Sequence, residues 1–266
     1  MKQLALELNT DNSEHTSSIG QCINELIEAD IPQPVTIAPH FLTQGESTML
    51  CSAAGASKTF TSQYLAACLS TGSHCFGFPT VKELKVLYID AELSPYQIQE
   101  RFKLIFSSLG CQPDDNNLTI IHKKSFKKGI PDLTYQEGYS QLADAFDSAD
   151  VIILDNISSI YRSAEELNQN DWNFYNSCLD KLRAENKAIL VLHHTDKSEK
   201  SYRGHSEIAR AIDNVLIAKK NKLESTNQKT VVSIENTKCR HSATSGPMFE
   251  YEFGYIEGKF RFTKTR

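Results

Sequence analysis

From about residue 47 onward, continuous apolar runs alternate with segments in which apolar residues recur every three or four positions. Residues 150–155 (DVIILD) and 188–194 (AILVLHH) are uninterrupted apolar runs, which are typical of strands covered on both faces. The same patterns predict further strands and the helices between them. These are strands at 47–51, 84–91 and 118–122 and helices at 57–71, 95–109, 136–147 and 171–185, with Ser94 as the N-cap of the second helix.

The alternation of strand and helix indicates the fold class. Strands that alternate with helices and read as continuous apolar runs form a mostly parallel sheet. The C-terminal part differs, because residues 214–219, 230–236, 248–255 and 259–263 are strand-like segments joined by turns. We therefore expect an α/β fold with a mostly parallel central sheet flanked by helices and a C-terminal antiparallel β extension.

The N-terminal part has a different composition from the rest. Residues 1–18 are polar and are predicted to be flexible. Residues 19–29 (IGQCINELIEA) have the apolar spacing of a helix, which Pro32 and Pro34 would end. We therefore predict a flexible and helical segment at 1–30 and one domain at 31–266.

The candidate chemistry begins with a loop between a predicted strand and a predicted helix. Residues 52–59 (SAAGASKT) fit the P-loop pattern, except that Ser52 and Ser57 stand where the pattern has glycine. Backbone N–H groups ahead of a helix bind phosphate oxygens. Lys58 has the place that reaches the β and γ phosphates of ATP, and the Thr59 hydroxyl has the place that holds Mg²⁺. The expected nucleotide contacts are Ser52, Ala53, Ala54, Gly55, Ala56, Ser57, Lys58, Thr59 and Phe60.

The two serines leave a question open for this loop. A serine with positive φ is strained where a glycine is not. Such strain would affect the rate of turnover rather than nucleotide binding. By itself the octamer also fits a chance turn between a strand and a helix, so the prediction depends on acidic residues downstream.

Two strand ends carry carboxylates that suit the loop. Asp155 ends the run at 151–155, and ligands of open α/β sheets bind at the carboxyl ends of strands. There Asp155 would hold Mg²⁺ directly or through water, unless it only caps a loop. Glu92 follows the strand at 84–91 and would take a proton from, or orient, the water that attacks the γ-phosphate, unless it only caps the next helix. Asp90 faces the same side of the sheet if the strand continues, but Glu92 lies nearer the strand end.

A third strand end, and the loop after it, add polar and basic groups. His193 and His194 end the run at 188–194, where a polar side chain contacts a γ-phosphate or meets solvent. The loop at 195–206 (TDKSEKSYRGHS) is polar and contains Arg203. Arg203 would bind a phosphate backbone, complete the nucleotide site of a neighbouring subunit, or belong to a solvated connector. A second basic run at 123–128 (KKSFKK) fits a path for a single strand or a solvated face.

Composition restricts the partners and the compartment. The formal net charge is −5, whereas a protein that grips nucleic acid alone is usually basic, so charge weakens a DNA-binding role without excluding it. No apolar run reaches the roughly 20 residues that span a bilayer, and the N-terminal stretch lacks the apolar segment of a signal peptide. The seven cysteines form no CxxC pair, so zinc and redox motifs are unsupported. We expect a cytoplasmic protein without a membrane partner.

Together these motifs resemble the RepA-type AAA ATPases of the RecA-like superfamily, which include plasmid replicative helicases and ATPases of phages and mobile elements. The resemblance covers about residues 30–263 and depends on the order and spacing of the motifs. In order, they are Ile31-Pro32, Phe41-Leu42 with Gly45, residues 52–59, Thr71-Gly72, Phe76-Gly77, residues 86–92 with Arg101, residues 151–155, residues 192–194, residues 203–206 and residues 238–240.

The resemblance implies a RecA-like P-loop fold and ATP hydrolysis with Mg²⁺. It implies Glu92 as the catalytic carboxylate, His194 or His193 as the γ-phosphate sensor, and Arg203 acting across subunits of a homo-oligomeric ring such as a hexamer. Three hypotheses follow. The first is a motor on single-stranded DNA that works with replication, recombination or mobile-element proteins. The second is a regulatory or assembly ATPase that switches a protein partner, and the third is a nucleotide-binding protein that has lost turnover.

Overall fold

The computed structural model describes residues 20, 22–80, 82–164, 169–240 and 246–266. Contacts between Cα atoms divide the chain into two units, Met1–Gln33 and Pro34–Arg266. In the first unit, helix α1 (Ile23–Glu28) is shorter than the helix predicted at 19–29, because Ala29 already has extended backbone, and no α1 residue is buried. The stretch predicted to be flexible, 1–18, lies outside the described residues, and the domain boundary at 30/31 stays a prediction.

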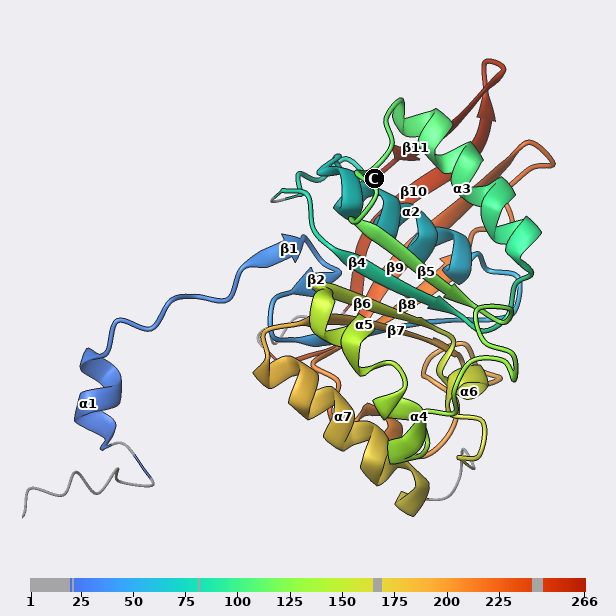
Figure 1. The fold of residues 1–266 in the computed structure, drawn as a ribbon. Helices are drawn as coiled ribbons and strands as arrows, with labels where there is room; N and C mark the ends of the chain where they lie inside the picture. The colour runs from blue at the N-terminus through green and yellow to red at the C-terminus, as the bar shows by residue number, and fades with distance from the viewer. Residues whose placement is uncertain (1–19, 21, 81, 165–168, 241–245) are drawn as a thin grey trace, which may run out of the picture. The chain divides into compact units, whose positions relative to one another are not determined.

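The second unit is built on a nine-stranded sheet with the strand order β11-β10-β9-β8-β3-β7-β6-β4-β5. From β8 to β5 every neighbouring pair is parallel, as expected for apolar strands separated by helices. These strands are β3 (Ser47–Ser52), β4 (Val86–Asp90), β5 (Leu118–His122), β6 (Val151–Asp155), β7 (Ala188–His194) and β8 (Asn214–Lys220) (Figure 1).

Three further strands continue the sheet in antiparallel order. They are β9 (Lys229–Cys239), β10 (Gly246–Ile256) and β11 (Lys259–Lys264), and each pairs with its neighbour in the chain. A separate antiparallel pair, β1 (Thr36–Ala38) and β2 (Leu42–Thr43), precedes β3. The predicted fold class, an α/β fold with a mostly parallel sheet and a C-terminal antiparallel extension, is therefore confirmed.

Helices cover both faces of the sheet. Successive strand residues point to opposite faces, and since both sets are apolar here, each face needs a cover. α2 (Lys58–Thr71) and α3 (Pro95–Leu109) pack on a core that contains Leu50 and Ile153. The neighbouring strand residues Met49 and Ile152 belong to the core of the other face. The helices there are α4 (Gln136–Ser140), α5 (Ala143–Ser148), α6 (Ile157–Ile160) and α7 (Asn173–Ala184) (Figure 1). None of the helices described is both long and apolar enough to cross a membrane.

Two predicted helices differ from the structure. Residues 136–147 form α4 and α5 instead of one helix, and Gly138 and Ser140 near the break have low helix propensity. The helix predicted at 171–185 begins with a separate 3₁₀ turn, Gln169–Trp172, because Trp172 is fully buried against the core of this face.

A buried carboxylate directly before β8 joins three elements. Asp213 is 1% exposed. Its Oδ2 accepts the Ser47 N–H at 2.9 Å, and its Oδ1 lies 3.0 Å from the Arg183 guanidinium and 3.2 Å from that of Arg240. Asp213 therefore ties the start of β3 to α7 and to the chain that follows β9. Arg240 belongs to the motif at 238–240 that the resemblance includes, and this contact gives it a structural role.

Replacing Asp213 by alanine would remove the buried carboxylate that Arg183 and Arg240 share. Removing one partner of a buried pair costs about 3–5 kcal/mol, and we expect the lower end because Arg240 is partly exposed. Urea unfolding of Asp213→Ala should show this loss in the free energy of unfolding. Asp180→Ala is the matched control, because Asp180 contacts the same Arg183 at a half-exposed position, where a pair contributes about 0–1 kcal/mol. Equal losses in the two variants would contradict the role assigned to Asp213.

Candidate nucleotide-binding site

The loop between β3 and α2 has the backbone of a phosphate-binding turn. β3 ends at Ser52, α2 begins at Lys58, and Gly55 between them has φ +77°. Of the two serines that replace glycines of the pattern, Ser57 has φ +71° whereas Ser52 is a buried strand residue. The strain expected for a serine with positive φ therefore falls on Ser57, while the backbone of Ser52 does not require glycine.

The loop borders a hollow of about 470 Å³. Most of the nucleotide contacts predicted from the sequence line it, together with Glu92 and His194. Ala53, Ala56 and Asp155 do not line it, and neither does Arg203. The lining residues are Ser52, Ala54, Gly55, Ser57, Lys58, Thr59, Phe60, Glu92, Leu93, Arg101, His194, Phe253 and Phe260.

Two carboxylates lie side by side and fully buried at the carboxyl ends of β4 and β6. Asp90 and Asp155 are register partners of the two strands. Tyr88 donates its hydroxyl to Asp155 Oδ2 at 2.8 Å. Burial, and next the charge of Asp90, raise the pKa of Asp155 to about 7, against the opposing effects of Lys58 and of hydrogen bonds from Tyr88 and Thr59. The positive charge near the two carboxylates is therefore too small to offset their burial and their mutual repulsion.

The carboxylate pair suits a divalent cation. Asp155 Oδ1 and Asp90 Oδ2 are buried and accept no hydrogen bond from the residues that the structure describes. Mg²⁺ is typically held by one or two carboxylates, with water and substrate phosphates completing its shell. In the described ranges no group of three or more His, Cys, Asp or Glu side chains could hold a metal by itself. A cation held by Asp155 and Thr59 beside Asp90 would therefore depend on nucleotide and water oxygens.

Glu92 lies in a turn and not on the strand that precedes it. β4 ends at Asp90, whose Oδ1 accepts the N–H groups of Glu92 at 2.9 Å and of Leu93 at 2.7 Å. Lys123 donates its ammonium to the Glu92 carbonyl at 2.9 Å. The sequence left open whether Asp90 and Glu92 share one side of a continuing strand. They do not, because Asp90 is buried beside Asp155 while Glu92 is exposed at the hollow.

The two histidines that end β7 have different surroundings. His193 is fully buried, and its Nε2 lies 2.7 Å from the Arg203 carbonyl oxygen. His194 is half-buried, lines the hollow, and its Nε2 lies 3.3 Å from Asn156 Nδ2. His194 is therefore the candidate sensor, and His193 fixes the loop that follows. Arg203 is exposed, and its N–H donates to the His194 carbonyl at 2.9 Å.

Several residues of the site could not be selected from the sequence. Asn156 follows Asp155 directly, but an amide after an apolar strand has no special pattern. Phe253 and Phe260 come from β10 and β11 and meet Phe60 with ring centres 5.0 Å and 5.7 Å away. Arg101 was already part of the motif series, and its guanidinium carbon lies 5.7 Å from the centre of the Phe60 ring. The three aromatic rings and Arg101 form one wall of the hollow only because α2, α3 and the C-terminal strands come together.

A phosphate loop after a parallel strand, with carboxylates at the ends of two neighbouring strands, defines the class of P-loop nucleotide-binding proteins. The chain belongs to the AAA domain family, whose profile matches residues 13–200. Among solved structures, a KaiC-like protein from the hyperthermophilic archaeon Pyrococcus horikoshii is similar, with a TM-score of 0.58 and 12% sequence identity over 88% of this chain and 99% of that chain. No curated protein matches the chain.

Family and fold together indicate an ATPase of the RecA-like type. The likeness to the KaiC-like protein supports the fold of the chain and leaves its partners open, because identity is low. The narrower resemblance to the RepA type stays a prediction.

Ser57 gives a test of the loop backbone. Left-handed backbone costs a residue other than glycine about 1–2 kcal/mol, and replacing Ser57 by glycine would relieve this cost. Part of the gain is offset by the greater freedom of glycine in the unfolded chain. The Ser57 side chain makes no capping hydrogen bond to α2, so its loss should cost little. We expect Ser57→Gly to raise the free energy of unfolding by up to about 1 kcal/mol and to leave ATP affinity within about twofold. Calorimetry and a fluorescent ATP analogue measure the two. A lower free energy of unfolding for Ser57→Gly would contradict the backbone strain assigned to Ser57. Ser57→Val should lower the free energy of unfolding, because a β-branched residue is strongly disfavoured at positive φ.

Proposed function

We propose that the chain hydrolyses ATP with Mg²⁺ at the hollow beside the loop at 52–59. In this proposal Lys58 and the backbone N–H groups of the loop bind the β and γ phosphates, and Thr59 and Asp155 hold the cation. The observation that supports it is the convergence of Lys58, Thr59, Glu92 and His194, from three separate parts of the chain, around one hollow. When bound, the cation neutralises charge on the phosphates.

Glu92 and His194 have the surroundings that hydrolysis needs. Glu92 is exposed at the hollow, so its carboxylate can orient a water molecule and accept its proton. His194 lies at the end of β7, also lines the hollow, and can contact the γ-phosphate. Asp90 is unsuited to the role of Glu92, because it is buried and one of its oxygens already accepts two backbone N–H groups.

The aromatic wall of the hollow gives the base of the nucleotide a place. Phe60, Phe253 and Phe260 line the hollow next to Arg101. Aromatic rings and a planar guanidinium stack on the faces of nucleobases. Stacking tolerates different bases, so this wall supports nucleotide binding without selecting adenine by hydrogen bonds.

Lys58→Ala and Glu92→Gln should separate binding from hydrolysis. Without the Lys58 ammonium, phosphate charge is no longer offset, so ATP affinity should fall at least about tenfold. Glu92→Gln keeps the shape of the side chain and removes its basicity, so ATP should still bind while hydrolysis falls about 10²–10⁴-fold. Titration calorimetry and phosphate release measure the two effects. Glu100→Gln is a control on an exposed face of α3. Wild-type behaviour of both site variants would refute the nucleotide site.

We further propose that hydrolysis drives a homo-oligomeric ring, such as a hexamer, along single-stranded DNA in the cytoplasm. The supporting observation is the loop that follows His194. It leads from the nucleotide hollow to a second hollow, of about 530 Å³, lined by Lys200, Tyr202, Arg210 and Lys238 among others. A change at the γ-phosphate can therefore reach a basic surface through one short segment.

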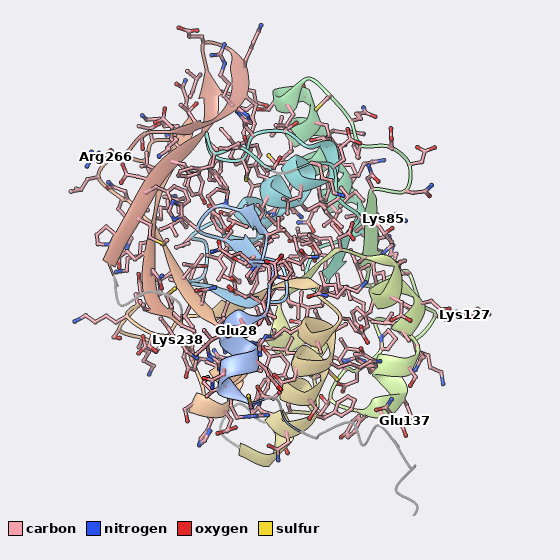
Figure 2. All side chains as sticks on the ribbon, turned by 90° about the vertical axis from the view of Figure 1, so that its left-hand side faces the viewer. Glu28, Lys85, Lys127, Glu137, Lys238 and Arg266 are labelled. Carbon is pink, nitrogen blue, oxygen red and sulfur yellow. The ribbon has the colours of Figure 1, made fainter. Side chains whose placement is uncertain are left out.

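The other basic run is a poorer candidate for a continuous path. Figure 2 shows Lys127, from the run at 123–128, and Lys238 on opposite sides of the molecule. A single strand that contacts both within one protomer would have to cross the structure. We therefore assign the DNA-binding role to the loop at 195–206 and to the hollow at its end.

A regulatory ATPase that switches a protein partner is the second candidate. Two cations of the basic hollow already have partners, since Arg210 pairs with Glu207 at 3.2 Å and Lys238 donates to the carbonyls of Ala209 and Ile212. Together with the net charge of −5, this reduces the attraction of the surface for a phosphate backbone. Such an ATPase would respond to a protein and not to DNA.

Arg203 gives a test of the ring. An arginine supplied by a neighbouring subunit contributes about 10³–10⁵ in rate, so Arg203→Ala and Lys58→Ala should each abolish most hydrolysis. Mixing the two inactive variants should restore activity, because one kind of interface then pairs an intact loop with an intact arginine. ATPase assays with and without single-stranded DNA, beside a mass measurement with and without ATP and Mg²⁺, test both proposals. A monomer whose specific activity is independent of concentration would exclude the shared site, and activity unmoved by DNA would favour the regulatory candidate.

A further inference from the structure

Asn156 connects Glu92 and His194, which both line the hollow. It follows β6 directly and is 1% exposed. Its Oδ1 accepts the Ser159 N–H at 3.0 Å and so caps α6. Its Nδ2 donates to Glu92 Oε1 and lies 3.3 Å from His194 Nε2. The whole amide is therefore in use, with the oxygen on the helix and the nitrogen on the two candidate hydrolysis residues.

The contacts of Asn156 fix which end of its amide is the donor. If oxygen and nitrogen were exchanged, the amide nitrogen would face the Ser159 N–H, and two donors would oppose each other. Nδ2 must therefore point at Glu92 and His194. Glu92 accepts with a carboxylate oxygen, and the contact with His194 is a hydrogen bond in the tautomer whose Nε2 carries no proton.

The contact with Asn156 occupies the Nε2 atom of the candidate sensor His194. While Nε2 accepts from Asn156, that nitrogen cannot donate to a phosphate oxygen. A donation from Nε2 to a γ-phosphate requires the ring to turn or the proton to move, and either change ends the contact with Asn156. Nδ2 of Asn156 then has Glu92 as its acceptor and has lost His194. A change at His194 therefore changes the hydrogen bonds of the same amide that holds the Glu92 carboxylate.

The rest of Glu92 is held independently of Asn156. Its N–H donates to Asp90, and its carbonyl accepts from Lys123. Loss of the Asn156 amide would therefore release the carboxylate while the turn stays in place. Such a loss should affect the orientation of the attacking water and spare the binding of the nucleotide phosphates, which belongs to the loop at 52–59.

We propose that Asn156 is the positioning residue that orients the Glu92 carboxylate for hydrolysis and couples it to His194. The inference rests on the proposed ATP hydrolysis. Asn156 acts through Glu92 and His194 and does not line the hollow, so it is not itself a catalytic residue. A role limited to capping α6 is the competing account.

Asn156→Ser separates the two accounts. Serine is a good N-cap, so α6 keeps an acceptor for the Ser159 N–H, while the donor to Glu92 and His194 is lost. We expect kcat to fall at least about tenfold, since positioning of a reacting group is lost, with KM for ATP and the affinity for a non-hydrolysable analogue within about twofold. The melting temperature should stay at the wild-type value. An unchanged kcat would overturn the proposal.

Asn156→Asp is the second variant, in case serine alters the fold. It keeps the acceptor and the size of the side chain but places a carboxylate against Glu92. A kcat loss at least as large as that of Asn156→Ser, with melting temperature retained, supports positioning. Losses of kcat that only follow losses of melting temperature across Asn156→Ser, Asn156→Asp and Asn156→Ala would leave Asn156 as a cap and overturn the proposal.

A double-mutant cycle tests the coupling to His194. If Asn156 transmits the state of His194 to Glu92, then His194→Ala combined with Asn156→Ser should be no slower than the slower single variant, within about twofold. If the fold-losses of kcat in the two single variants multiply in the double variant, the coupling is overturned. Failure of the underlying function is distinct, because a wild-type protein that binds ATP without hydrolysing it removes both proposals, whereas wild-type hydrolysis with unchanged Asn156 variants removes this one alone.

Discussion

The buried carboxylates at the ends of β4 and β6 are the constraint on which the site depends. Asp90 and Asp155 are register partners, and neither is exposed. Burial and mutual repulsion both disfavour two negative charges in such a place. The charge that offsets them comes from the loop side, where Lys58 is buried at the start of α2 and the helix N-terminus adds its partial positive charge. The loop and the carboxylates therefore belong to one electrostatic unit, which a divalent cation would complete.

Tyr88 shows how the fold holds this unit together. Its hydroxyl donates to Asp155 at 2.8 Å and lies 2.7 Å from the Ser62 hydroxyl on α2. One side chain of β4 thus joins the helix that follows the phosphate loop to the candidate magnesium carboxylate. Asp90 has a comparable double role, because one oxygen fixes the turn of Glu92 and the other remains beside Asp155. Acids close in space can therefore have different tasks, since their surroundings differ.

The antiparallel extension completes the hollow from the far end of the sequence. Phe253 and Phe260 are strand residues of the last hairpin, yet they contact Phe60, which follows the phosphate loop by one residue. Extending the parallel sheet past β8 places this hairpin over α2, where Tyr251 also meets the Thr61 hydroxyl. The extension therefore contributes to the nucleotide site as well as to the core.

The sequence by itself determined the features that are local in the chain. A continuous apolar run predicted β7 with its ends, and a strand-like segment predicted β5. The Ser94 cap and the bounds of α3 agree with the structure, and short patterns were enough to propose the loop at 52–59 and the strand end at Asp155. Tertiary structure decided what depends on contacts between distant segments. It placed His194 at the hollow and His193 in the core, gave Ser57 rather than Ser52 the positive φ, brought the hairpin aromatics to the hollow, and brought Asn156 against Glu92 and His194. Side-chain neighbours across a sheet are set by strand order and register, which no single segment of sequence contains.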